Sequence, residues 1–448
     1  MKPILLEPTD VLFFRDAVPM SAGQGKGAGC RLPFPSTLHE ALRTSLLLAS
    51  DKITSAKDVP GRPSKAPRKG NWHAESHDTD IHIASKAYCS LRTVGPFPWT
   101  ETKEKQDILL PVPLDVAWEN DPGTAPNQPP RALRRLQLLR DTAAAWPPPP
   151  QGPETFVPPC LPVATTPPDK HGQLHGWWTS AQFADYLKGE TANTNHRFGP
   201  LPTERLWQAE HRIGVQINPG TFAAEHGQLY AGSYLRAHGS TRFVMQAGLS
   251  DPRNGEADEL DGLQWLLLGG EQRLARLWHK GFRDPFADLA KPPIAPAGDG
   301  ACLLKWVMVT PAIFAHGSLP GWCWNSSDAR PAGQVRLGAS ARKSERAALP
   351  GRAQLISWCL GKPLTVSGWD FVEQTAKPTR LALPVGSVYY FLCENRPTAS
   401  ALAKKLHWQP RSDFYGEKGC GYGLASFDVQ MHPTSPDVPA LANELLNC

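Results

Sequence analysis

Proline is the residue that most constrains how this chain can fold. The sequence has 46 prolines among 448 residues, and fourteen of them fall between residues 122 and 168. Because proline fixes φ and lacks an amide donor, this stretch is not expected to form the interior of a helix or sheet. Within it, residues 131–146 have leucines at helical spacing and several arginines. That pattern predicts a short helix with a solvated basic face.

Length and charge set broad limits on what the chain can be. At roughly 150 residues per domain, the length predicts two or three domains. A hydrophobic share of 41% predicts a globular chain with a core. The formal net charge of +5 permits nucleic-acid binding, but a basic surface would require local clustering of cations. Residues 61–70 hold four cations and no acid, and form either a surface loop or an arm that touches RNA phosphate.

Cysteine usage predicts a reduced, metal-free protein. The nine cysteines include no C-x-x-C pair, so neither a metal site nor another cofactor is expected. Four lie in or beside apolar runs and are predicted to be buried thiols: Cys160, Cys302, Cys359 and Cys393. The sequence shows no signal-peptide pattern and no run of eighteen apolar residues. We therefore expect a cytoplasmic protein without a membrane segment.

The N-terminal region predicts a strand, a loop and a helix in that order. Residues 1–14 suit a strand, and Ser21–Gly29 carries four glycines and suits a loop. Thr37 and Glu40 have the spacing of a capping box at the start of a helix. Apolar residues then recur at helical period. This order suits the beginning of an α+β unit.

Extended segments and short helices alternate along the rest of the chain. Residues 213–217 and 228–235 flank a long connection, which predicts a hairpin. Residues 303–310 and 385–393 predict strands, whereas residues 351–360 predict a short helix. Because no βαβ unit repeats, the predicted fold class is α+β.

The clearest binding feature is a run of four glycines within eight positions, Gly416–Gly423. Glycine lets the backbone approach a ligand and adopt positive φ, so consecutive exposed amides can form an anion-binding concavity. Lys418 adds a positive charge, and Tyr415 and Tyr422 could stack on bases. Two alternatives stay open: the run is a tight turn between elements, and Tyr422 is a core residue.

The N-terminal loop Arg15–Arg31 is the second candidate for binding. It leads into the predicted helix, whose N-terminus offers unpaired amides and a partial positive charge that suit phosphate. Lys26 lies within the loop, and Arg43 follows on the helix. The alternative is an ordinary charged loop with a plain helix cap. The two glycine-rich features together favour an anion-binding role more than either does alone.

No catalytic constellation emerges from the sequence. The fourteen histidines show no metal-binding spacing, and neither a nucleophile elbow nor a Walker A motif occurs. A metal-independent ribonuclease could still use a lone histidine as general acid or base, and His39 and His407 are the candidates. A lone histidine is more often a packing or surface residue, so no catalytic residue is assigned.

Several motifs, in order along the chain, resemble a known family. The opening L-E-P-T-D-V-L-F-F-R-D is followed by a glycine-rich loop and F-P-S-T-L-H-E-A-L-R-T. Later come V-T-P-A-I-F at 309–314, V-S-G-W-D at 366–370 and V-G-S-V-Y-Y-F at 385–391, before the terminal glycine loop. Together they resemble the RAMP superfamily of CRISPR proteins. Within it, they resemble the type III-B (Cmr) effector-complex subunit that holds the 5′ end of the guide RNA (crRNA).

The resemblance implies a fold of two ferredoxin-like (RRM-like) domains with long loop insertions. The N-terminal domain would span residues 1–236, with insertions near 51–75 and 119–170. The C-terminal domain would span residues 237–448 and carry the glycine-rich loop.

The resemblance also implies a non-catalytic subunit that binds the repeat-derived 5′ handle of crRNA. Such a subunit would bridge the large polymerase/cyclase-like subunit and a backbone RAMP subunit, and would meet target RNA only indirectly. The rival hypotheses are a guide-processing endoribonuclease of the same superfamily and a scaffold whose loops bind protein. The expected RNA-binding residues are Arg15, Gln24, Lys26, Arg31, Ser36, Thr37, Arg43, Gly416, Lys418, Gly419, Gly421, Tyr422 and Gly423.

Overall fold

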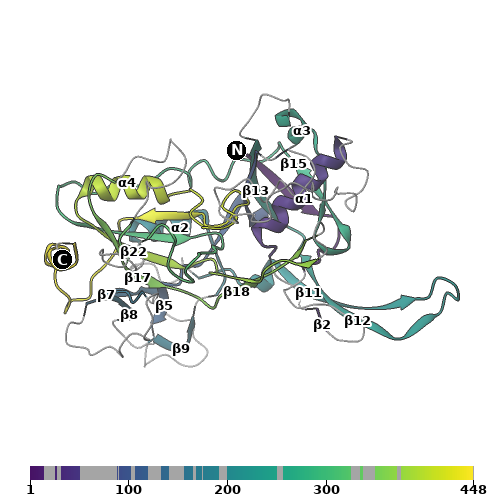
Figure 1. The fold of residues 1–448 in the computed structure, drawn as a ribbon, viewed down its shortest axis with the longest axis horizontal. Helices are drawn as coiled ribbons and strands as arrows, with labels where there is room; N and C mark the ends of the chain where they lie inside the picture. Colours follow the sequence, from purple (N-terminus) through teal and green to yellow (C-terminus); the bar gives the residue numbers. More distant parts are fainter. Residues whose placement is uncertain are drawn as a thin grey trace.

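Two antiparallel sheets, packed against each other, organise the molecule (Figure 1). The computed structural model describes residues 1–14, 26–27, 32–50, 88, 90–101, 106–119, 133–140, 156–164, 168–173, 175–190, 199–249, 256–323, 333–335, 349–370 and 375–446. The mixture of α and β with mostly antiparallel pairing agrees with the predicted α+β class.

The first sheet has seven strands in the order β10-β4-β3-β13-β1-β15-β14. Their bounds are β1 (Lys2–Pro8), β3 (Leu91–Glu101), β4 (Gln106–Pro111), β10 (Trp177–Thr179), β13 (Thr241–Leu249), β14 (Trp265–Leu268) and β15 (Arg273–Trp278). Helices α1 (Pro35–Ala49) and α3 (Glu256–Gly262) contribute to the core on one face. Leu38, Leu42 and Leu46 recur on one side of α1 and pack there.

The second sheet has four strands in the order β17-β22-β16-β23. Their bounds are β16 (Cys302–Met308), β17 (Ala353–Cys359), β22 (Val388–Cys393) and β23 (Gly423–Ser426). Helix α4 (Arg396–Leu406) packs on one face, against Leu304 and Trp306. The alternate residues Leu303 and Val307 face the first sheet.

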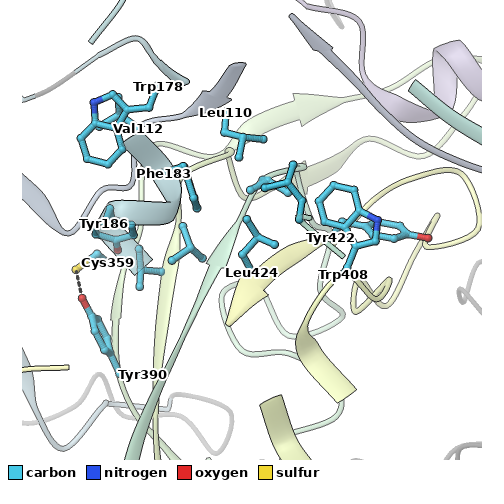
Figure 2. Close-up of a cluster of buried hydrophobic side chains, with 14 of the residues drawn as sticks. Leu110, Val112, Trp178, Phe183, Tyr186, Cys359, Tyr390, Trp408, Tyr422 and Leu424 are labelled. Atoms are coloured by element: carbon cyan, nitrogen blue, oxygen red, sulfur yellow. Dashed lines mark hydrogen bonds between the residues drawn. The ribbon is translucent and has the colours of Figure 1, made fainter. Parts of the chain in front are cut away.

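One hydrophobic core therefore joins the two sheets. It contains Val94 and Phe97 of β3 together with Val388 and Tyr390 of β22. Helices α2 (Ser180–Lys188) and α5 (Val438–Leu446) add side chains to the same core. Figure 2 shows its aromatic members around Leu424.

A long hairpin projects from the body of the molecule (Figure 1). It consists of β11 (Trp207–Ile217) and β12 (Ala224–Ala237), preceded by the short helix η3 (Thr203–Arg205). The predicted hairpin is confirmed, with longer strands than expected. The short strand β2 (Lys26–Gly27) runs parallel to β12, opposite Ala231 and Gly232.

Smaller sheets complete the described structure. They are β5 (Val116–Glu119), β6 (Leu133–Arg135) and β9 (Pro168–Gln173); β7 (Gln137–Leu139) with β8 (Leu161–Val163); β18 (Leu364–Val366) with β21 (Arg380–Ala382); and β19 (Trp369–Asp370) with β20 (Thr375–Ala376). A further short helix, η5 (Gly270–Gln272), precedes β15.

Two predicted helices are wrong in the described residues. Residues 133–139 form β6 and β7, because they pair with β5 and β8 rather than with themselves. Residues 353–359 form β17, a strand buried on both faces: Leu355 packs toward α4, and Ile356 packs toward the first sheet. A strand buried on both faces lacks regular alternation of apolar and polar residues, so its sequence does not distinguish it from a buried helix.

The strands predicted at residues 1–14, 303–310 and 385–393 are confirmed as β1, β16 and β22. The four cysteines predicted to be buried thiols are also confirmed. The domain division predicted after residue 236 falls at the last residue of β12, within the span of the first sheet. The cationic run at 61–70 lies outside the described residues. No helix in the described part of the chain is long and apolar enough to span a membrane.

Candidate functional site

The glycine run lies against the helix that follows the N-terminal loop. Lys418 forms an ion pair with Glu40 of α1. The amide of Thr93 in β3 donates to the carbonyl oxygen of Glu417 at 3.2 Å. A Cβ on Gly419 would lie 3.3 Å from the Cβ of Pro35. Two features from opposite ends of the sequence therefore meet; we call this place the junction, comprising the first two turns of α1 and residues 414–423.

The backbone of the glycine run donates to protein carbonyls. The amide of Gly419 donates to Gly416 at 3.1 Å, and the amide of Gly421 donates to Pro311 at 2.8 Å. The carbonyl of Gly423 accepts from Trp408 at 2.8 Å. The predicted phosphate grip by Gly419 and Gly421 is therefore not the arrangement found, because both amides already have partners.

Close packing accounts for two of the glycines. Gly421 has φ +75°, and a Cβ there would come within 2.2 Å of the backbone nitrogen of Ser412. A Cβ on Gly423 would come within 2.3 Å of Nε1 of Trp306. Real Cβ atoms do not approach neighbours so closely, so these positions require glycine for steric reasons. The alternative interpretation, a tight turn between elements, describes the run in this structure.

Tyr422 lies in the core between the sheets, with 3% of its surface exposed (Figure 2). Its ring packs edge-on to Trp408 at a centroid distance of 5.9 Å. Burial raises its pKa well above the usual range. Of the two roles predicted for Tyr422, core packing is therefore the one found, and stacking on a base is not.

The first turn of α1 differs from its prediction. The helix begins at Pro35, and no side chain caps it. Proline is favoured at this first position because it has no amide that needs a partner. The capping box predicted at Thr37 is therefore wrong: Thr37 lies inside the helix, and its amide donates to Phe34 at 2.9 Å. Ser36 is half-buried and Thr37 is exposed, so the helix N-terminus reaches the surface.

Cations surround the carboxylate of Glu40. Burial acts to raise its pKa, but nearby positive charges outweigh burial and hold the pKa well below its usual range. Lys418 contributes most, followed by His39, Lys377 and Arg43. Arg43 is fully buried, and the Lys418 side chain is 5% exposed. Predicted and unpredicted residues both contribute to the positive charge that acts on Glu40.

The remaining predicted binding residues are in the N-terminal loop. Arg15, Gln24 and Arg31 lie outside the described residues. The backbone of Lys26 forms β2 and pairs with Ala231 of the hairpin. The described part of the loop, residues 26–27, therefore lies beside the hairpin.

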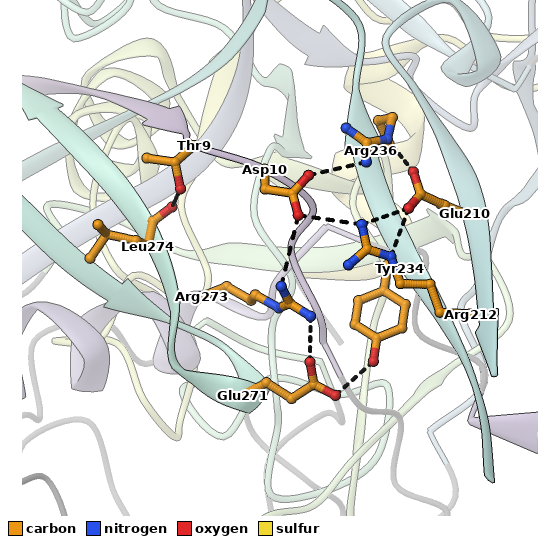
Figure 3. Close-up of polar contacts among 9 residues, drawn as sticks. All are labelled: Thr9, Asp10, Glu210, Arg212, Tyr234, Arg236, Glu271, Arg273 and Leu274. Carbon is orange, nitrogen blue, oxygen red and sulfur yellow. Dashed lines mark hydrogen bonds and ion pairs between the residues drawn. The ribbon is translucent and has the colours of Figure 1, made fainter. Parts of the chain in front are cut away.

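The hairpin root carries an ionic network that the sequence did not reveal (Figure 3). Asp10 accepts from Arg212 at 3.3 Å and from Arg236 at 3.1 Å, and lies 3.8 Å from Arg273. Glu210 accepts from Arg212 at 2.7 Å and also binds Arg236. These hydrogen bonds, that of Arg236 first, lower the pKa of Glu210 to about 2.

An aromatic ring completes the network. Two guanidinium groups face the ring of Tyr234, Arg212 at 5.2 Å and Arg273 at 5.3 Å. The Tyr234 hydroxyl donates to Glu271 at 2.6 Å. Because its partners are far apart in the sequence, no local pattern could have identified this network.

A second unpredicted feature is the small sheet β18–β21, which covers part of the junction. Leu364 and Val366 of β18 pack against a buried cluster of Ile313, Ala382 and Phe414. Phe34, the residue before α1, and Tyr415 pack against the same cluster. The guanidinium carbon of Arg380 lies 3.8 Å from the ring centroid of Phe414.

The two candidate catalytic histidines are buried. His407 donates to the carbonyl of Leu289 at 2.7 Å and accepts from the amide of Ala425 at 3.1 Å, so both ring nitrogens hold structure together. Burial lowers its pKa. His39 is 1% exposed and lies 3.1 Å from the Thr93 hydroxyl. Across the described ranges, no group of three potential metal-ligating side chains is found.

Comparison with known proteins identifies the family to which the chain belongs. The family model described as CRISPR-associated protein (Cas_Cmr3) matches residues 4–427. No curated protein sequence matches.

Two solved structures of the type III-B Cmr-beta complex bound to cognate target RNA, one of them also with AMPPnP, contain a similar chain. For each, identity is 14%, the TM-score is 0.42, and coverage is 87% of this chain and 86% of that chain. A chain of the Csm3–Csm4 subcomplex of the type III-A interference complex matches with 9% identity and a TM-score of 0.35, covering 87% of this chain and 92% of that chain. The family model spans far more than half of the sequence, and the chain therefore belongs to the Cmr3 family of CRISPR-associated proteins.

Proposed function

We propose that this chain is a non-catalytic subunit of a type III-B Cmr effector complex and binds the repeat-derived 5′ handle of crRNA. The observation that carries the proposal is the family match over residues 4–427. The junction, where the ion pair of Lys418 with Glu40 brings the N-terminal region to the glycine run, supports it. We further propose that the chain bridges the large subunit and a backbone RAMP subunit in the cytoplasm.

The proposed architecture is a pair of ferredoxin-like units. In the first sheet, β3-β13-β1-β15 are neighbours in that order, with α1 after β1 and α3 after β13. In the second sheet, β17-β22-β16-β23 follow the same order, with α4 after β22. Both orders are those of a β-α-β-β-α-β unit in which the first strand lies between the third and fourth. By strand membership, the division between the units lies between Trp278 and Cys302.

The mode of RNA binding follows from what the junction exposes. The handle is single-stranded, and contacts to its phosphates position RNA without reading its sequence. The uncapped N-terminus of α1 at Ser36 and Thr37 attracts anions. Residues of the N-terminal loop, which precedes that terminus in the sequence, are proposed to supply further hydrogen-bond donors: Arg15, Gln24, Lys26 and Arg31. Arg43 and Lys418 would act mainly through their charge, because both are buried.

Nuclease protection of the handle tests the binding proposal. A Cmr complex reconstituted with this chain is expected to protect the 5′ handle, and the same subunits without the chain are expected to leave it accessible. Equal protection in both preparations would contradict handle binding.

Incubation of the chain with repeat RNA, without metal, tests the non-catalytic proposal. No cleavage is expected, because His39 and His407 are buried. Cleavage that His39→Ala or His407→Ala abolishes would favour the endoribonuclease hypothesis instead.

A further inference from the structure

The sheet β18–β21 and the described residues between its strands form an arm, residues 364–370 and 375–382, one face of which lies on the junction. Val366 pairs with Arg380, and Leu364 pairs with Ala382. Because side chains alternate along a strand, these four residues share a face, and that face packs on Phe414. Phe34 packs against the same cluster. Leu381 points the other way and is 61% exposed.

Arg380 is held in a geometry that suits phosphate. Its guanidinium lies on the Phe414 ring, with 3.8 Å between the guanidinium carbon and the ring centroid. Stacking on a ring fixes the guanidinium plane while its N–H donors remain at the edge, where they can form a bidentate contact. Within the described residues, Arg380 forms no ion pair.

Lys377 is the second cation of the arm and is also held in place. Its amide donates to the carbonyl of Gly368 at 2.8 Å, and its side chain passes 3.5 Å from where a Cβ on Gly368 would lie. Its charge reaches the junction, because it acts on the carboxylate of Glu40. That carboxylate already pairs with Lys418. In the part of the chain that the structure describes, Lys377 has no ion pair of its own.

The arm therefore places two half-buried positive charges beside the junction, where Glu40 already pairs with Lys418. Partly desolvated cations gain most from a ligand that supplies both charge and hydrogen-bond acceptors. Phosphodiester groups do this, and the uncapped start of α1 next to the arm favours the same kind of ligand. The apolar residue Leu381, which would suit a protein partner, is on the opposite face.

We propose that Lys377 and Arg380 bind phosphates of the single-stranded guide RNA. The arm and the neighbouring start of α1 would then form two surfaces that contact the RNA. The inference rests on the proposed function, because it assigns additional residues to the same RNA. Each surface would bind the phosphate backbone of the RNA without reading its bases.

Salt titration of crRNA binding tests the inference in the reconstituted complex. In single-stranded RNA, each phosphate contact contributes about 0.7 to the slope of log affinity against log salt. The double variant Lys377→Ala, Arg380→Ala is expected to bind more weakly, with a slope less negative by about 1.4. The charge-conserving variant Lys377→Arg, Arg380→Lys is expected to keep the parent slope. Lys404→Ala removes an exposed charge from α4, which lies against the other face of the second sheet, and should also keep it.

The outcomes separate the arm from the handle. An unchanged slope in the double alanine variant, with handle protection still dependent on this chain, would overturn the role of the arm and leave the proposed function standing. If the double alanine variant is lost from the complex and the slope is unchanged, the arm contacts a protein subunit. That outcome would also overturn the inference. If handle protection never depends on the chain, the proposed function itself fails. Thermal melting of each variant establishes that it is folded.

Discussion

At the scale of single residues, the glycine run is constrained by distances to its neighbours. Gly421 combines φ +75° with a Cβ position 2.2 Å from the Ser412 backbone nitrogen. A left-handed backbone costs a non-glycine residue about 1–2 kcal/mol, and overpacking adds about 1–3 kcal/mol. We expect Gly421→Ala to lower the free energy of unfolding by about 2–5 kcal/mol, measured by urea unfolding of the full chain. Gly239→Ala, with open space around it, is the matched control; equal losses would contradict the packing account.

A buried ion pair between the two sheets leads to a prediction about pH. Nζ of Lys305 in β16 lies 3.5 Å from Oδ2 of Asp115, with both side chains at most 2% exposed. Tyr186 and Tyr390 donate to the same carboxylate at 2.6 and 3.0 Å. Burial lowers the pKa of Lys305 to about 8, although the charge of Asp115 opposes this.

The sign of the pH effect follows from this lowered pKa. Between pH 8 and 10 the unfolded chain keeps the Lys305 proton that the folded chain has lost, so this group makes the fold more stable as pH rises. Above pH 10 the two tyrosines, whose pKa values burial raises, act in the opposite direction. At 1.36 kcal/mol per pKa unit, the stability of the parent relative to Lys305→Met should rise by about 3 kcal/mol over this window. A difference that stays flat, or falls, in urea unfolding at pH 8 and pH 10 would contradict the lowered pKa of the buried lysine.

At the scale of elements, the sequence predicted secondary structure correctly where apolar residues lie on one side of an element. It also did so where β-branched and aromatic residues are abundant. It predicted α1, the β11–β12 hairpin, β16 and β22. It failed at β17, because a strand buried on both faces lacks the alternation that distinguishes strands. It failed at β6 and β7, because pairing with β5 and β8 outweighed the helical spacing of the leucines.

The ionic network at the hairpin root is expected to control how the hairpin moves rather than how stable the whole fold is. Exposed ion pairs contribute about 0–1 kcal/mol each, and Asp10 is 44% exposed. The double variant Asp10→Ala, Glu210→Ala should therefore melt close to the parent. It should, however, exchange amide hydrogens faster in residues 207–237, because five arginine contacts at the root are lost. Hydrogen–deuterium exchange measures this effect.

Asp288→Ala is the control for the hairpin experiment. It removes another exposed carboxylate that binds two cations, Arg283 and Lys291, away from the hairpin. Exchange in the hairpin should stay at the parent rate. If the double variant does the same, the network does not hold the hairpin.

At the scale of the whole molecule, the candidate site could be predicted only in outline. The sequence suggested that its two glycine-rich regions act together, and the ion pair of Lys418 with Glu40 brings the glycine run to the helix that follows the first of them. The arm formed by β18 and β21 and the partners of Asp10 were missed, because each depends on contacts between residues distant in the sequence. The same limit explains Tyr422: its burial between two sheets is a property of their packing.

Photocrosslinking between the crRNA handle and this chain tests directly whether the chain binds the handle. Complexes would be assembled with crRNA carrying a photoreactive nucleotide at each handle position in turn, and the crosslinked peptides identified by mass spectrometry. If this chain binds the handle, crosslinks are expected from handle positions to the start of α1, to the N-terminal loop and to the arm. Crosslinks confined to other subunits, with none to this chain from any handle position, would contradict handle binding.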